Sequence, residues 1–154
     1  MKTITNYLQE ERSFEKQNSV KALVKRGNYV LIIRRQEGHP GAGQWDLPGG
    51  HIEKGENKED ALKREVCEEV DLEIEDIKFI KKSNLKIPEK GIDSDMNLYC
   101  CKAKSCGVEL KPADWEGADG KAEHNEYAWI ENKTDLENLP MLDIIRDVIM
   151  KELK

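Results

Sequence analysis

The chain lacks the features that mark membrane and secreted proteins. Aromatic residues make up only 6% of its 154 residues, and no apolar run approaches the ~20 residues that a transmembrane helix needs. The first 17 residues contain no apolar segment of the kind found in signal peptides. Four cysteines, of which Cys100 and Cys101 are adjacent, do not form the disulfide framework of a small secreted domain. We therefore expect a cytoplasmic protein with reduced thiols and no membrane contact.

An excess of positive charge is also missing. The chain has 25 lysines and arginines against 31 aspartates and glutamates, which gives a net charge of -6. No segment rich in lysine and arginine stands out that could neutralise the phosphates of a long nucleic acid. An anionic substrate would therefore need a bound metal or a few local arginines. The balance of 36% charged and 38% hydrophobic residues is typical of one globular domain.

The order of the elements predicts an α+β fold. Residues 1–17 are polar and form an expected N-terminal extension, with the domain proper at 18–154. Alternating apolar residues around a turn at Arg26-Gly27-Asn28 predict a β-hairpin, and the glycine-rich segment 36–56 predicts a loop. We expect a helix at 57–70, strands at 76–82, 97–103 and 127–130, and a final helix after Pro140. This order favours a mixed sheet that is covered by helices on both faces.

The segment "REVCEEVD" concentrates negative charge on the predicted helix. Glu65, Glu68 and Glu69 stand at i, i+3 and i+4, so a helix places them side by side. Two carboxylates ~5 Å apart repel by about 3 kcal/mol at an effective dielectric constant of ~20. A solvated helix face is one interpretation, because exposed pairs of this kind cost only a few tenths of a kcal/mol. A multivalent cation among the carboxylates is the other.

A longer pattern surrounds this segment and favours the cation. From Gly50 to Leu72 the sequence resembles the Nudix box, G-x5-E-x7-R-E-U-x-E-E-x-G-U, in which U is an aliphatic residue. Eight of its nine defined positions match, and the preceding "GQWDLPGG" is similar to the lead-in of MutT-type members. The resemblance implies a Nudix fold, an α/β/α sandwich around a mixed β-sheet, over most of the chain. The remaining position holds Asp71, where the family has a glycine that ends the helix at positive φ; aspartate tolerates this conformation.

The resemblance, together with the chemistry of these residues, assigns the catalytic and metal-binding roles. Mg²⁺ prefers oxygen ligands and commonly bridges carboxylates to substrate phosphates, and Mn²⁺ can replace it. We expect Glu65, Glu68 and Glu69 as metal ligands, with the Gly50 carbonyl implied by the family. Glu65 is also the expected general base. In some family members the base lies in a late loop, where Glu123 matches and Glu126 is the weaker candidate.

Other polar residues receive positioning or binding roles. Arg64 is expected to orient a carboxylate, with Glu56 as its implied partner, although a purely structural salt bridge is the alternative. Arg34 and Arg35 end a strand near the glycine loop and are candidates for phosphate binding, or simply an exposed strand end. Trp115, in a polar loop, is a candidate for stacking on a base. The three histidines lack metal-ligand spacing and receive no role.

The sequence therefore predicts a Mg²⁺-dependent pyrophosphohydrolase whose substrate is a nucleoside diphosphate linked to a group X. We favour a MutT-like enzyme that acts on nucleoside triphosphates. Pro88 resembles a proline associated with the ADP-ribose group of the family, which leaves an ADP-ribose or nucleotide-sugar hydrolase as the alternative. A nucleotide-sensing module without catalysis is a third interpretation. The expected partner is a small nucleotide, and the sequence leaves open whether the chain forms a homodimer.

Overall fold

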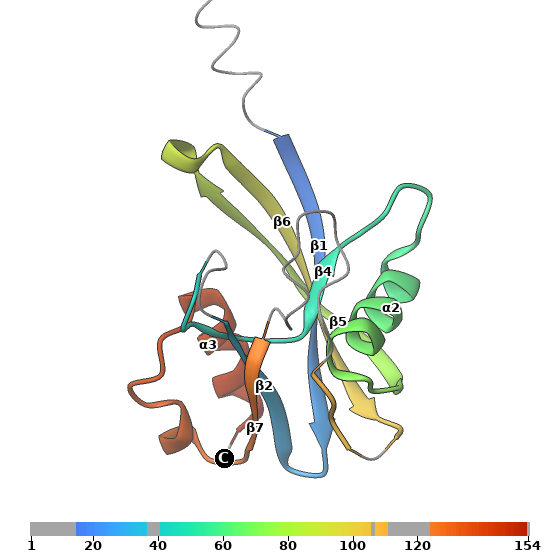
Figure 1. The fold of residues 1–154 in the computed structure, drawn as a ribbon, viewed down its shortest axis with the longest axis vertical. Helices are drawn as coiled ribbons and strands as arrows, with labels where there is room; N and C mark the ends of the chain where they lie inside the picture. Colours follow the sequence, from blue (N-terminus) through green and yellow to red (C-terminus); the bar gives the residue numbers. More distant parts are fainter. Residues whose placement is uncertain (1–14, 37–40, 106, 111–123, 154) are drawn as a thin grey trace, which may run out of the picture.

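The computed structural model describes residues 15–36, 41–105, 107–110 and 124–153 (Figure 1). The strands are β1 (Glu15–Arg26), β2 (Tyr29–Arg35), β3 (Trp45–Asp46), β4 (Gly49–His51), β5 (Ile74–Ile87), β6 (Ile92–Ala103) and β7 (His124–Ile130). The α-helices are α2 (Lys58–Val70) and α3 (Asp143–Glu152), and two short 3₁₀ helices are η1 (Pro88–Lys90) and η2 (Lys133–Leu136). None of the described helices is long and apolar enough to span a bilayer.

The strands form one mixed sheet. Its main order is β3-β2-β1-β6-β5, while β4 pairs with β1 and β7 pairs with β2. Strands β1 and β6 run parallel along most of their length, and the other pairs are antiparallel. The prediction of a mixed sheet is confirmed.

Each face of the sheet is covered by one α-helix, which confirms the predicted α/β/α arrangement. Alternate residues of β1 divide between the two faces: Val20, Ala22 and Val24 pack toward α2, and Leu23 packs toward α3. Figure 1 shows the sheet between the green helix α2 and the red helix α3. Leu62, Val66 and Val70, whose helical spacing predicts this helix from the sequence, are buried there together with Ala61. On the other face, α3 buries Ile145, Val148 and Ile149.

The hairpin opens early, and this opening makes room for the site. β1 and β2 pair only next to their turn, at Lys25 with Val30 and Arg26 with Tyr29. Further along, β1 pairs instead with β4, where Val20 lies opposite Gly50. The segment expected as a loop thus contains two short strands. Its two adjacent glycines lie at the sheet beside α2 (Figure 1).

Several strands are longer than the apolar pattern predicts. β1 begins at Glu15, and β5 and β6 continue to Ile87 and from Ile92. Polar side chains hold these extensions together, because Asn84 donates a hydrogen bond of 2.9 Å to the nearly buried Asp95. Hydrophobic periodicity cannot detect strands that are stabilised in this way.

The boundaries of α2 follow from local chemistry. Asn57 caps the start, since its side chain accepts a hydrogen bond from the Asp60 backbone N–H at 2.8 Å. Asp71 ends the helix in the left-handed region, with φ 58° and ψ 36°, and its N–H donates to the Cys67 carbonyl at 3.1 Å. The helix predicted from the sequence, including its unusual end, is confirmed.

Replacing Asp71 with glycine should stabilise the fold. Glycine adopts the left-handed conformation without the cost that a β-carbon imposes, so we expect the free energy of unfolding to rise by about 0.5–1 kcal/mol. Urea denaturation of the variant measures this change. Asp71→Ala is the matched control and should lower stability, because alanine keeps the β-carbon but lacks the short polar side chain that lets aspartate tolerate this conformation. If both variants shifted stability in the same direction, the conformational explanation would be wrong.

Candidate active site

Arg64 is the centre of a group of carboxylates on α2 and the loop before it. Its Nε and Nη2 atoms donate to the two oxygens of Glu56 at 2.8 and 2.9 Å, which is a bidentate contact. Its Nη1 atom donates to Glu65 Oε1 at 3.0 Å and to Glu68 Oε2 at 3.1 Å. Nη2 also donates to the carbonyl of His51 at 2.9 Å. The expected contact between Arg64 and Glu56 is therefore present, and it extends to two further glutamates.

These contacts fix the protonation states of the pair. The hydrogen bond from Arg64 holds the pKa of Glu56 below its usual value. In return, Glu56, followed by Glu65 and Glu68, raises the pKa of Arg64. Glu56 therefore stays ionised at neutral pH and does not serve as a proton donor. Its geometry suits a residue that orients the guanidinium.

Arg64→Lys tests this orienting role. Lysine keeps the charge but cannot make a bidentate contact with Glu56 while reaching Glu65 and Glu68. We expect kcat to fall by about tenfold, because the carboxylates lose their fixed positions, whereas the fold remains intact. Steady-state kinetics together with circular dichroism would measure both effects. Wild-type turnover in this variant would show that Arg64 contributes only charge.

Glu65 lies directly against the backbone of Gly50. A β-carbon added to Gly50 would be 2.4 Å from Glu65 Oε2, closer than any real contact. Glycine is therefore needed at this position for the carboxylate to occupy its place. The Glu65 side chain is 15% exposed, and Glu68, one turn further, is 45% exposed.

Glu69 is placed differently from the other two glutamates. Its Oε1 atom accepts a hydrogen bond from the Gly49 backbone N–H at 3.1 Å, and its Oε2 atom lies 3.2 Å from His124 Nδ1. Both side chains are almost fully buried. The interpretation of the glutamates as a solvated helix face therefore does not apply to Glu69. His124 was given no role by the sequence, since its approach to Glu69 arises only in the folded chain.

The donor set fits a hard divalent cation such as Mg²⁺. A positively charged nitrogen of Arg64 already lies about equally far from Glu65 and Glu68, so these two carboxylates converge on a cation. Among the residues with described positions, no three acidic, histidine or cysteine side chains form a ready metal cluster. Mg²⁺ is commonly bound by one or two carboxylates and completes its octahedron with waters and substrate phosphates. Glu65 and Glu68, with Gly50 beside them, are the residues that would hold it.

Two of the candidate substrate residues, Arg34 and Arg35, lie against the glycines of the loop before β3. Arg34 forms an ion pair of 3.6 Å with Glu126. Arg35 contacts the loop itself, because a β-carbon added to Gly41 would lie 3.4 Å from its Cδ atom. Trp115 and Glu123 fall outside the described residues.

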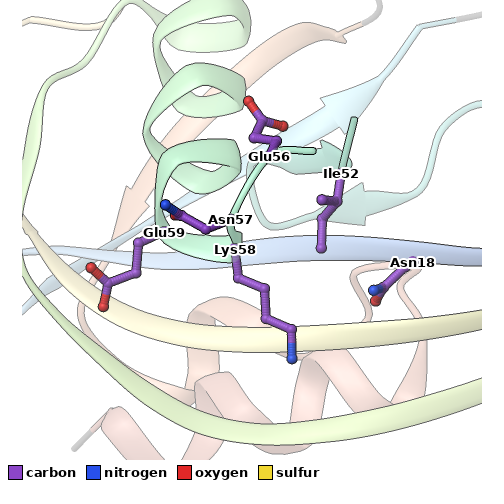
Figure 2. Close-up of a pocket in the computed structure, with 6 residues that line it drawn as sticks. All are labelled: Asn18, Ile52, Glu56, Asn57, Lys58 and Glu59. Atoms are coloured by element: carbon purple, nitrogen blue, oxygen red, sulfur yellow. The ribbon is translucent and has the colours of Figure 1, made fainter. Parts of the chain in front are cut away.

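A pocket of about 580 Å³ opens next to this site. Its lining consists of Asn18, Ile52, Glu56, Asn57, Lys58 and Glu59. Figure 2 shows Asn18 and Ile52 on one side of the pocket and the first residues of α2 on the other. Glu56 belongs both to this lining and to the Arg64 group, so the pocket and the carboxylates form one continuous region.

Comparison with known proteins identifies the class. The family model of the NUDIX domain matches residues 15–148, and the chain belongs to this family. The predicted family and fold are thus confirmed. The MutT NUDIX hydrolase from Burkholderia pseudomallei superimposes with a TM-score of 0.73 at 21% identity, over 91% of this chain and 99% of that one. Nudix hydrolases as a class use a divalent metal.

Three relatives indicate the range of activities near this sequence. An 8-oxo-dGTP diphosphatase from Buchnera aphidicola is 34% identical over 71% of this chain and 68% of its own length. An ADP-ribose pyrophosphatase from Methanocaldococcus jannaschii is 29% identical over 87% of this chain and 70% of its own. A Mycobacterium tuberculosis protein named for 8-oxo-dGTP diphosphatase activity is 41% identical, but the match covers only 38% of this chain and 41% of that relative.

Proposed function

We propose that the protein is a Mg²⁺-dependent pyrophosphohydrolase that cleaves a nucleoside diphosphate linked to a group X, with nucleoside triphosphates as the favoured substrates. The observation that supports this proposal is the convergence of Glu65 and Glu68 on one positively charged nitrogen of Arg64, next to Gly50. In the reaction, water attacks a phosphorus atom of the diphosphate and two phosphorylated fragments leave.

Each side chain of the site has a separate role in the proposed reaction. When bound, the divalent ion neutralises the diphosphate and lowers the pKa of a coordinated water. Glu65, held against Gly50, accepts a proton from the attacking water as general base. Arg64, itself held by Glu56, keeps the Glu65 and Glu68 carboxylates in position. Glu123 is the second candidate for the base, since its place in the late loop matches that of the base in some family members.

The substrate preference rests on the relatives. Two of the three relatives above carry the name 8-oxo-dGTP diphosphatase, which favours a triphosphate for this chain. The ADP-ribose pyrophosphatase supports the alternative, an ADP-ribose or nucleotide-sugar hydrolase. Arg34, Arg35 and Trp115 are the proposed contacts to phosphate and base.

A panel of nucleotides tests the proposal. We expect Mg²⁺-dependent release of pyrophosphate from a deoxynucleoside triphosphate, and less turnover of ADP-ribose and of nucleotide sugars. Coupled detection of phosphate after treatment with pyrophosphatase or phosphatase would measure each product. Greater turnover of ADP-ribose would establish the alternative. Binding of a nucleotide without hydrolysis of any substrate would identify a sensing module.

The metal requirement gives a separate prediction. Because the same oxygen ligands bind Mg²⁺ and Mn²⁺, activity should be lost in excess chelator and return with either ion. Turnover would be followed during titration with each metal. Full activity in excess chelator would contradict the assignment of Glu65 and Glu68.

A further inference from the structure

His124 and Glu69 meet in the interior between β7 and α2. The distance from His124 Nδ1 to Glu69 Oε2 is 3.2 Å, and the two side chains are 6% and 10% exposed. On the opposite side of the carboxylate, the Gly49 N–H donates to Glu69 Oε1 at 3.1 Å. A buried carboxylate is costly unless polar groups compensate it. The Gly49 N–H satisfies Oε1, whereas Oε2 accepts no hydrogen bond of regular geometry from the described residues and has the imidazole of His124 beside it.

A β-bulge explains why His124 faces α2. Arg34 pairs with Glu126, whereas the next residue, Arg35, pairs with His124, so β7 contains one extra residue at this point. Paired residues share a face of the sheet, and alternate residues along a strand share it too. Arg35 lies two residues after Ile33, which packs in the core under α2. His124 is therefore directed to the α2 face, and without the bulge it would be directed to the other.

We propose that His124 is a positioning residue for the metal site, which acts by holding Glu69 in a fixed orientation. The inference rests on the proposed function and on the expectation from the sequence that Glu69 is a metal ligand beside Glu65 and Glu68. Partners of a metal-binding carboxylate commonly change metal affinity or activity by 10–100-fold when they are removed. The contact also joins β7 to the Gly49-Gly50 pair, so His124 supports the backbone on which the carboxylate of Glu65 rests.

His124→Asn and His124→Gln carry the same amide group and test which position of the side-chain nitrogen is needed beside Glu69. In His124→Asn, the amide nitrogen takes roughly the place of Nδ1, so it can still approach Glu69. In His124→Gln, the side chain is longer and brings the amide nearer to the place of Nε2, away from the carboxylate. His124→Leu removes the polar group entirely. We expect His124→Asn to keep a Mn²⁺ affinity and a Gly49 exchange rate close to those of the wild type. His124→Gln and His124→Leu should bind Mn²⁺ more weakly and exchange the Gly49 amide faster.

The first readout is metal binding in the absence of nucleotide. Calorimetric titration with Mn²⁺ should show ~10–100-fold weaker binding for His124→Gln and His124→Leu, and a change below about threefold for His124→Asn. With substrate, kcat should fall by a similar factor while KM changes little, because the proposed role of His124 acts through Glu69.

The second readout is the amide of Gly49, which reports the carboxylate directly. Hydrogen exchange at this amide should be accelerated in the glutamine and leucine variants and remain slow in the asparagine variant. In the wild-type protein, addition of Mg²⁺ should shift the Nδ1 resonance of His124. This last measurement needs no variant to fold, and it does not need the protein to hydrolyse any nucleotide.

Any one of three results would overturn the proposal. The first is an unchanged Mn²⁺ affinity in folded His124→Gln and His124→Leu, and the second is equal hydrogen exchange at Gly49 in all variants. The third is a His124 Nδ1 resonance that does not shift when Mg²⁺ is added. A wild type that binds metal, shifts this resonance and yet cleaves no nucleotide would instead contradict the proposed function while supporting the role of His124. The two ideas therefore fail in distinguishable ways.

Discussion

Replacing Glu68 with glutamine is expected to lower turnover by on the order of a hundredfold or more. Glutamine keeps the size of the side chain and removes one unit of charge from the proposed metal site, which supplies several kcal/mol of transition-state stabilisation. Glu65→Gln should cost at least as much, since Glu65 is also the proposed base. Initial rates at saturating Mg²⁺, with the nucleotide that the panel identifies, would measure both effects.

The stability of the metal-free variant should hardly change. Glu68 is 45% exposed and shares Arg64 with two other glutamates, so the loss of one ion pair and the relief of one repulsion nearly cancel, within about 0.5 kcal/mol. Glu73→Gln is the matched control, because Glu73 is exposed just beyond α2. It should change neither quantity. If Glu68→Gln and Glu73→Gln turned over equally, Glu68 would be only a solvated residue of the helix face.

The structure explains how the chain tolerates its glutamates before a metal binds. The sequence alone suggests repulsion among Glu65, Glu68 and Glu69 that is either screened by solvent or relieved by a cation. In the folded protein, Arg64 supplies a positive charge to two of them, and Glu69 turns inward to Gly49 and His124. The repulsion among the three glutamates is therefore reduced in two ways within one turn of α2: by the charge of Arg64 and by the inward direction of Glu69.

Local sequence patterns predicted the features that depend on residues close together in the sequence. The stripe of Leu62, Val66 and Val70 predicted α2, and the position of Asp71 predicted its left-handed end. The contact between Arg64 and Glu56 followed from the family resemblance, because the cap and first turns of α2 separate them by a fixed number of residues. Each of these features lies within a segment of about twenty residues, where spacing determines geometry.

Features that depend on strand pairing could not be predicted in this way. The facing of His124 depends on a bulge opposite Arg34 and Arg35, and a histidine in a polar segment shows no sign of it. The extensions of β5 and β6 depend on hydrogen bonds between Asn84 and Asp95 rather than on apolar alternation. Hydrophobic periodicity therefore gives no information about polar residues that flank an expected strand, as His124, Asn84 and Asp95 do.

Replacement by alanine should affect different properties at the two adjacent glycines: mainly turnover at Gly50 and mainly stability at Gly49. At Gly50, the three atoms nearest to the added β-carbon all belong to the Glu65 carboxylate, with Oε2 at 2.4 Å, and that flexible carboxylate can move aside. We expect stability to fall by less than about 1 kcal/mol. Turnover should fall by on the order of a hundredfold, because a displacement of about 1 Å at a catalytic group has such a cost.

At Gly49, the added β-carbon would lie 2.0 Å from the backbone oxygen of Val20, which cannot move without disrupting the pairing of β1 and β4. Gly49→Ala should therefore lower the free energy of unfolding by about 3 kcal/mol. Gly27→Ala, in the hairpin turn at φ 59° with open space around it, is the control for backbone strain alone and should lose about 1 kcal/mol without loss of activity. Urea denaturation and initial rates of all three variants separate the effects. Normal turnover in a well-folded Gly50→Ala protein would mean that the position of the Glu65 carboxylate does not limit catalysis.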